Sequence, residues 1–71
     1  MTAEQMFEAL GYVRLVEDKN IMIWMGNHDD IWIEFDLVES KYFITKYEEA
    51  TSIKVSLHKA ITQQMKELGW L

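Results

Sequence analysis

The side chains best suited to chemistry lie in one short segment, where His28 is followed by Asp29 and Asp30. An imidazole beside two carboxylates offers ligand atoms that divalent cations accept. The spacing matches neither a calcium-binding EF-hand loop nor the converging ligands of a zinc site, to which only His58 could be added. We therefore interpret the segment as a solvated turn and predict no bound metal or cofactor. A metal-binding or enzymatic role centred on His28 and His58 remains an alternative.

Catalysis by a nucleophile has little support in the sequence. None of the serines Ser40, Ser52 and Ser56 lies in a recognisable strand-to-helix elbow or beside an evident base. The three glycines are far apart, so the chain has no glycine-rich phosphate loop and no dinucleotide-binding fingerprint. We predict that the chain is not an enzyme.

The chain is acidic, with twelve aspartates and glutamates against seven lysines and arginines and a net charge of −5. Five of the acids fall within an eleven-residue segment that contains no basic residue: Asp29, Asp30, Glu34, Asp36 and Glu39. Proteins that bind nucleic acids neutralise phosphates with lysine and arginine, so we predict no direct binding to nucleic acid or to anionic membranes. The same acidic surface suggests an alternative function, that of a decoy that inhibits a nucleic-acid-handling protein.

Composition predicts one folded domain over residues 1–71. Hydrophobic residues make up 49% of the chain and three are tryptophans, which is too apolar for a disordered segment. A domain of this size buries only about 60% of the surface of its unfolded chain, so we expect a protein partner, such as a second copy in a homodimer, to cover part of it.

The longest apolar run has five residues, so no membrane span is expected. The absence of cysteine and of a basic amino-terminal signal leads us to expect a cytoplasmic protein.

The segment 21–36 organises the predicted fold as a hairpin. Residues 31–36 alternate between apolar and polar, whereas residues 21–25 are apolar throughout, and the loop between them is rich in turn-forming residues. If Met25 and Ile31 close the loop, Ile23 lies opposite Ile33 and Trp24 lies opposite Trp32. That register predicts that both indoles lie on the same side of the sheet, away from the isoleucines.

Each end of the chain predicts a helix. Thr2 and Gln5 form a capping box ahead of an apolar face, and Gly11 follows as a left-handed terminal residue, with Tyr12 packing back across the cap. The second helix is expected to begin at Ser56 as its N-cap and to end at Gly69.

Two further strands are expected, at residues 12–16 and 41–47. For the second of these, one register places Ile44 beside Ile33 and Tyr42 beside Phe35, and a slip of one residue reverses its faces. A further edge strand near Ile53 is an open alternative. The predicted fold class is α+β, with the order α-β-β-β-β-α: a four-stranded antiparallel meander with an N-terminal and a C-terminal helix packed on one face.

If both helices cover the face that carries the isoleucines, the other face becomes an aromatic interaction surface. Its predicted members are Met22, Trp24, Trp32, Phe43 and Tyr47. Exposed apolar patches often mark protein contacts, so the favoured function is a small protein-interaction module that self-associates or docks another protein. Arg14 is expected at the rim of this surface, together with two of the acids. The alternative is a three-layer domain with one helix on each face, which would have no such patch.

The two ends of the chain, residues 1–12 and 58–70, resemble the ends of small uncharacterised proteins encoded by phages and prophages of Gram-positive bacteria. The likeness covers both predicted helices, and the Ile-Glu-Phe-Asp strand at 33–36 is also similar. The resemblance implies a cytosolic bacterial or phage protein, and the favoured function then includes docking a host or phage protein. Its motifs are helix caps and core residues, so it implies no functional site.

Overall fold

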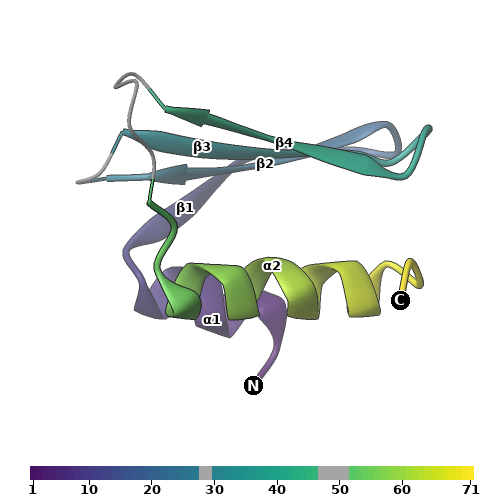
Figure 1. The fold of residues 1–71 in the computed structure, drawn as a ribbon. Coiled ribbons are helices and arrows are strands. Elements are labelled where there is room, and N and C mark those ends of the chain that lie inside the picture. Colours follow the sequence, from purple (N-terminus) through teal and green to yellow (C-terminus); the bar gives the residue numbers. More distant parts are fainter. Residues whose placement is uncertain (28–29, 47–51) are drawn as a thin grey trace.

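A computed structural model describes residues 1–27, 30–46 and 52–71, and it shows the predicted α+β order. Four antiparallel strands form one sheet in the order β1-β2-β3-β4. Both helices lie on the same face of this sheet (Figure 1), so the prediction of helices on one face is confirmed and the three-layer alternative is wrong. The elements are α1 (Ala3–Ala9), β1 (Tyr12–Glu17), β2 (Ile21–Gly26), β3 (Ile31–Asp36), β4 (Lys41–Lys46) and α2 (Val55–Glu67).

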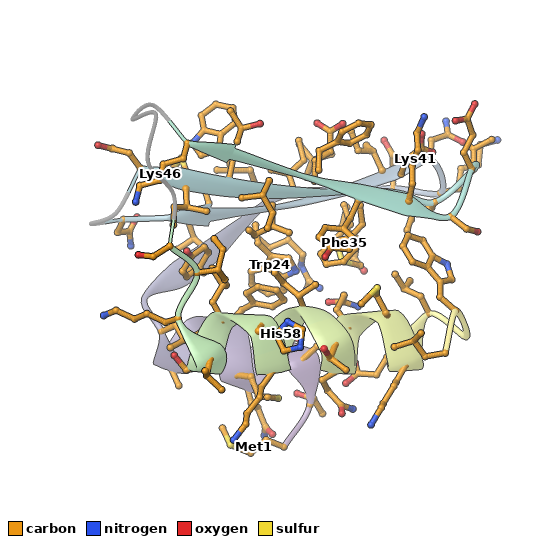
Figure 2. The ribbon with its side chains drawn as sticks, in the orientation of Figure 1. Met1, Trp24, Phe35, Lys41, Lys46 and His58 are labelled. Carbon is orange, nitrogen blue, oxygen red and sulfur yellow. The ribbon has the colours of Figure 1, made fainter. Side chains whose placement is uncertain are left out.

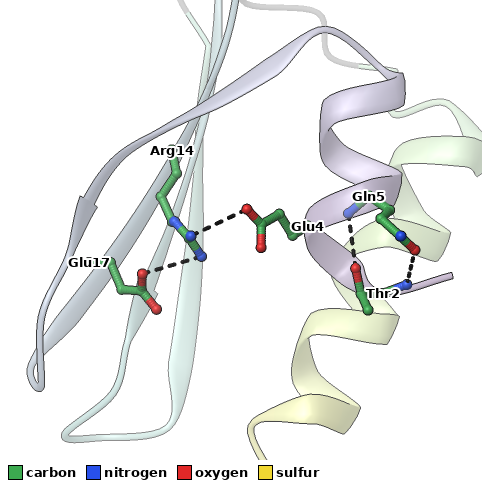
Figure 3. Close-up of polar contacts among 5 residues, drawn as sticks. All are labelled: Thr2, Glu4, Gln5, Arg14 and Glu17. Carbon is green, nitrogen blue, oxygen red and sulfur yellow. Dashed lines mark hydrogen bonds and ion pairs between the residues drawn. The ribbon is translucent and has the colours of Figure 1, made fainter.

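Helix α1 begins with the predicted capping box. The Thr2 hydroxyl accepts a hydrogen bond from the Gln5 backbone N–H at 3.1 Å, and the Gln5 side-chain oxygen accepts one from the Thr2 backbone N–H at 2.9 Å (Figure 3). The helix has seven residues, too few to be stable alone in water. It is held by packing, since Phe7 is completely buried, and by the Ala3 N–H, which donates to Glu67 of α2 at 2.7 Å.

Both helices end at the predicted glycines. Gly11 and Gly69 have φ angles of 86° and 79°, in the left-handed region that glycine adopts without steric cost. After α2, the Gly69 N–H donates to Lys66 and the Trp70 N–H donates to Met65, which is the Schellman arrangement. After α1, the Tyr12 ring packs against Phe7 with 5.8 Å between ring centroids, as predicted.

The predicted start of α2 is wrong. Its N-cap is Lys54, whose backbone is extended and whose side chain makes no capping hydrogen bond, and Ser56 lies inside the first helical turn. A serine caps a helix only from a residue with non-helical backbone angles, so Ser56 is placed too late to do so. The edge strand suggested at Ile53 is also wrong, because Ile53 lies in the connection to α2 and packs partly buried against the core.

Of the two strand registers predicted from the sequence, one is correct and the other is wrong. Between β3 and β4, Ile33 lies opposite Ile44 and Phe35 opposite Tyr42, as predicted. Between β2 and β3, Trp24 lies opposite Ile33, and Trp32 lies opposite Met25. The predicted Trp24 to Trp32 pair is therefore out by one residue, and a shift of one residue moves every side chain of β2 to the other face.

The core lies between the sheet and the helices, and Trp24 is at its centre. Its side chain is 1% exposed and stacks on Phe7, with 4.6 Å between ring centroids and 13° between ring planes. Figure 2 shows Trp24 and Phe35 both pointing from the sheet toward α2. Within the described residues, Trp24 Nε1 is buried with no hydrogen-bond partner, so the indole contributes by packing.

The two tryptophans on neighbouring strands provide a matched test of this core. We expect Trp24→Ala to lower the free energy of unfolding by about 3–5 kcal/mol, because it opens a large cavity beneath α1. We expect Trp32→Ala to lower it by less than about 1 kcal/mol, since that side chain is 40% exposed. Urea unfolding followed by circular dichroism measures both, and equal losses would contradict the register. Trp24→Phe removes the unpaired N–H while keeping a ring, and provides a folded variant if Trp24→Ala does not fold.

The uncapped start of α2 yields a second expectation. Lys54→Asp supplies an acceptor for the first backbone N–H groups of the helix, and should raise the free energy of unfolding by about 0.5–2 kcal/mol. Ser56→Ala should change it by less than about 0.5 kcal/mol, because Ser56 does not cap the helix. Thermal unfolding of both variants checks this, and a larger loss in Ser56→Ala than gain in Lys54→Asp would show that the assigned cap is wrong.

Candidate functional site: the open face of the sheet

The candidate site is the face of the sheet that points away from both helices, here called the open face. Residues opposite one another on antiparallel strands share a face, and successive residues alternate between faces. Because Met22, Trp24, Ile33 and Phe35 are buried under the helices, their neighbours along each strand point the other way.

The registers place the open-face residues in three rows that cross the strands. The first row runs across all four strands as Val13, Met25, Trp32 and Thr45. The second row is Val16, Ile23, Glu34 and Phe43. The third row, beside the β1–β2 and β3–β4 turns, is Ile21, Asp36 and Lys41. The first two rows therefore hold one carboxylate among seven uncharged side chains, six of them apolar.

The exposure of these side chains differs across the face. Trp32 is 40% exposed and Phe43 is 46% exposed, and Val13 and Val16 on β1 are also exposed. Ile23 and Met25 in the middle of the sheet are partly buried. Exposed apolar side chains thus lie on both outer strands and on β3, and the partly buried apolar side chains of β2 lie between β1 and β3.

The predicted interaction surface is partly correct in position. Trp32 and Phe43 lie on the open face as predicted, but Met22 and Trp24 do not, because the register of β2 places both of them in the core. Tyr47 lies outside the described residues. Sequence reasoning missed Ile23 and Met25, and the uniformly apolar run 21–25 contains no alternation that could have identified them.

Arg14, predicted at the rim of the interaction surface, is instead on the helix side of the sheet. Its guanidinium is 3.5 Å from Glu4 of α1 and 3.3 Å from Glu17 of β1 (Figure 3). It also lies over the Trp24 ring, 5.2 Å from the ring centroid. The side chain therefore ties β1 to α1 and contributes nothing to the open face.

The predicted acidic residues do not form one cluster. Asp30 precedes β3 and Glu39 follows it, so the length of a six-residue strand separates them, roughly 20 Å. Asp36 accepts hydrogen bonds from the backbone N–H groups of Val38 and Glu39 at 3.0 Å, so it stabilises the β3–β4 turn. The Glu39 carboxylate is 2.6 Å from Lys41 Nζ. Asp29 lies outside the described residues.

The carboxylates at the turn end of the sheet line a shallow hollow of about 460 Å³. Glu34, Asp36 and Glu39 are joined there by Asp18 from the β1–β2 turn. Asp18 accepts hydrogen bonds from two backbone N–H groups of its own turn, at 2.7 and 3.0 Å. Two of the four carboxylates are thus engaged by backbone N–H groups.

The histidines are not brought into a metal site in the part of the chain that is described. His58 is exposed on α2 (Figure 2), where it lines a shallow hollow with Lys59 and Lys66. His28 lies outside the described residues. Among residues 1–27, 30–46 and 52–71, no group of three histidine, aspartate or glutamate side chains is placed to hold a metal ion.

A smaller hollow of about 200 Å³ lies at the start of α2, on the helix side of the sheet. Its lining includes Tyr12, Lys46, Ser52 and Lys54. Its volume is below the roughly 300–1,000 Å³ of typical small-molecule sites, so the open face is the more substantial candidate.

No family model, curated protein or solved structure matches this chain. The resemblance of its two ends to phage and prophage proteins therefore stays a prediction. None of the helices among the described residues has the length and apolar character needed to cross a membrane.

Proposed function

We propose that the chain is a protein-interaction module that docks a protein through the open face, with Trp32 and Phe43 as its main contact residues. The observation that carries this proposal is the arrangement of the two layers. Both helices lie on one face of the sheet (Figure 1). The other face carries apolar side chains on all four strands. Apolar patches of this kind usually mark binding surfaces, and tryptophan is among the residues that contribute most binding energy there.

The spread of apolar side chains over neighbouring strands of the open face supports a protein as its ligand. Trp32 and Phe43 lie on adjacent strands in adjacent rows, with partly buried Ile23 and Met25 on the strand beside them. A rigid sheet presents these side chains with little loss of conformational freedom on binding, which favours affinity. The proposed partner is a second copy of the chain or a host or phage protein.

The alternative, an acidic decoy for a nucleic-acid-handling protein, has the acidic hollow as its support. Glu34 and Glu39 would contribute to binding a basic partner there. It is the weaker proposal because Asp18 and Asp36 already accept backbone hydrogen bonds, and Glu39 is paired with Lys41.

The docking proposal is tested by capturing protein partners from a bacterial lysate on immobilised chain. Trp32→Glu places a charge in the first row and should reduce capture at least about tenfold, as expected for a residue at the centre of an interface. Val55→Glu is the matched control, since Val55 is also exposed and apolar but lies at the start of α2 on the helix side. Equal capture by wild type and Trp32→Glu would refute the proposal.

The salt dependence of partner binding distinguishes the docking module from the acidic decoy. Apolar docking should persist, within about threefold, between roughly 50 mM and 500 mM sodium chloride, whereas binding through the carboxylates should weaken steeply over that range because exposed charges are screened. Elution of the captured protein along a salt gradient measures this. If the captured protein elutes at low salt, and Trp32→Glu does not change how much of it is captured, the result would favour the decoy.

A further inference from the structure

We infer that the partner on the open face is a protein segment that carries an arginine among apolar side chains, and that this arginine pairs with Glu34. This inference rests on the proposed docking function and specifies the chemistry of the partner. Three observations carry it: the place of the Glu34 carboxylate within the apolar rows, the acidic hollow beside it, and the two aromatic side chains next to it.

Glu34 is the charged residue within the first two rows of the open face. It lies between Ile23 on β2 and Phe43 on β4, and it is partly buried. Among residues 1–27, 30–46 and 52–71, no group forms an ion pair or a hydrogen bond with its carboxylate. A wholly apolar partner would remove water from this carboxylate and give it nothing in exchange, which opposes binding. The partner that fits therefore brings its own polar group to Glu34.

The acidic hollow favours a cation over a neutral hydrogen-bond donor as that group. The strand residues that line it, Ile21, Glu34 and Asp36, all belong to the open face, so the hollow opens beside the apolar rows. Its volume of about 460 Å³ is ample for one long side chain. Of the four carboxylates that line it, the other three are engaged by turn N–H groups or by Lys41. A cationic side chain in the hollow therefore gains from the negative potential and pairs with Glu34.

The neighbouring rings favour arginine over lysine. Trp32 lies two residues before Glu34 on the same face of β3, about 6.6 Å along the strand, and Phe43 lies directly opposite Glu34. A guanidinium can pair with a carboxylate and also stack flat on an aromatic ring, which an ammonium does less well. This chain contains the same combination, since the Arg14 guanidinium pairs with two carboxylates and lies 5.2 Å from the centroid of the Trp24 ring. Enclosed by rings, such a pair is screened by salt less than an exposed one.

A second copy of this chain lacks the cation that Glu34 needs. The three rows of the open face hold one cationic residue, Lys41. Its Nζ is 2.6 Å from the Glu39 carboxylate and 5.4 Å from the centroid of the Phe43 ring, so it is engaged within its own chain. The net charge of −5 also makes two copies repel each other. A different protein, basic beside its apolar contact residues, is therefore the better fit.

Selection of short random peptides from a displayed library tests the chemistry of the partner. Peptides that bind the immobilised wild type but not Trp32→Glu should be enriched in arginine flanked by apolar residues. On Glu34→Gln the enrichment in arginine should disappear and the apolar enrichment should remain. Glu8→Gln is the matched control, because Glu8 is an exposed glutamate on α1, and it should select the same peptides as the wild type. Circular dichroism confirms that the variants fold.

The affinity of one selected peptide tests the contact itself. Glu34→Gln, or replacement of the peptide's arginine by glutamine, should raise the dissociation constant measured by fluorescence anisotropy at least about tenfold. Because both changes remove the same contact, the two together should cost little more than either alone. Fully additive losses would overturn the pairing. Lysine in place of the peptide's arginine should weaken binding, and equal affinity would overturn the preference for arginine.

Failure of this inference and failure of the docking function give different results. Peptides that depend on Trp32 but are acidic, or lack arginine, overturn the inference and leave the docking function standing. In sedimentation equilibrium the wild type should keep the 8.5 kDa mass of one chain. A dimer that Trp32→Glu abolishes would identify a second copy as the occupant and overturn the inference as well. Both proposals fail if no peptide distinguishes the wild type from Trp32→Glu.

Discussion

The stacking of Trp24 on Phe7 is the interaction on which the rest of the structure depends. It holds the seven-residue α1 against the sheet, which that helix could not do through its own hydrogen bonds. The same indole lies under the Arg14 guanidinium, which reaches Glu4 on α1. One side chain on β2 therefore links β1, β2 and α1, and its burial sets the face of the sheet that the helices cover.

The two-layer arrangement follows from how little helix the chain has. The described helices, of seven and thirteen residues, bury the β2 and β3 side chains of one face, and Tyr42 and Ile44 of β4 stay partly exposed even there. The two helices pack against each other on that face, where Ala3 of α1 donates to Glu67 of α2. Neither described helix covers the apolar side chains of the other face, where Trp32 and Phe43 are 40% and 46% exposed, and this is the physical basis of the docking proposal.

The acidic residues illustrate how local structure limits what composition can indicate. A run of five acids in eleven residues looks like one charged surface in the sequence. In the structure, Asp30 lies just before β3 and Asp36 at its far end, and Asp36 is engaged by its own turn. Glu34 alone of them lies in the second row of the open face, between Ile23 and Phe43.

The sequence by itself determined the elements of the fold, because each has a local physical signal. The capping box of Thr2 and Gln5 and the left-handed residues Gly11 and Gly69 are properties of a few neighbouring residues. The alternation in residues 31–36 likewise assigns the faces of β3, and with them the positions of Trp32 and Glu34.

Only the tertiary structure decided which side of β2 is buried. Residues 21–25 are all apolar, so either face could enter the core, and the choice depends on the register against β3 and on the space beneath α1. Trp24 fills that space against Phe7, and Ile23 and Met25 are consequently left on the open face. The membership of the candidate site is therefore a property of packing between distant elements, which no local pattern in the chain records.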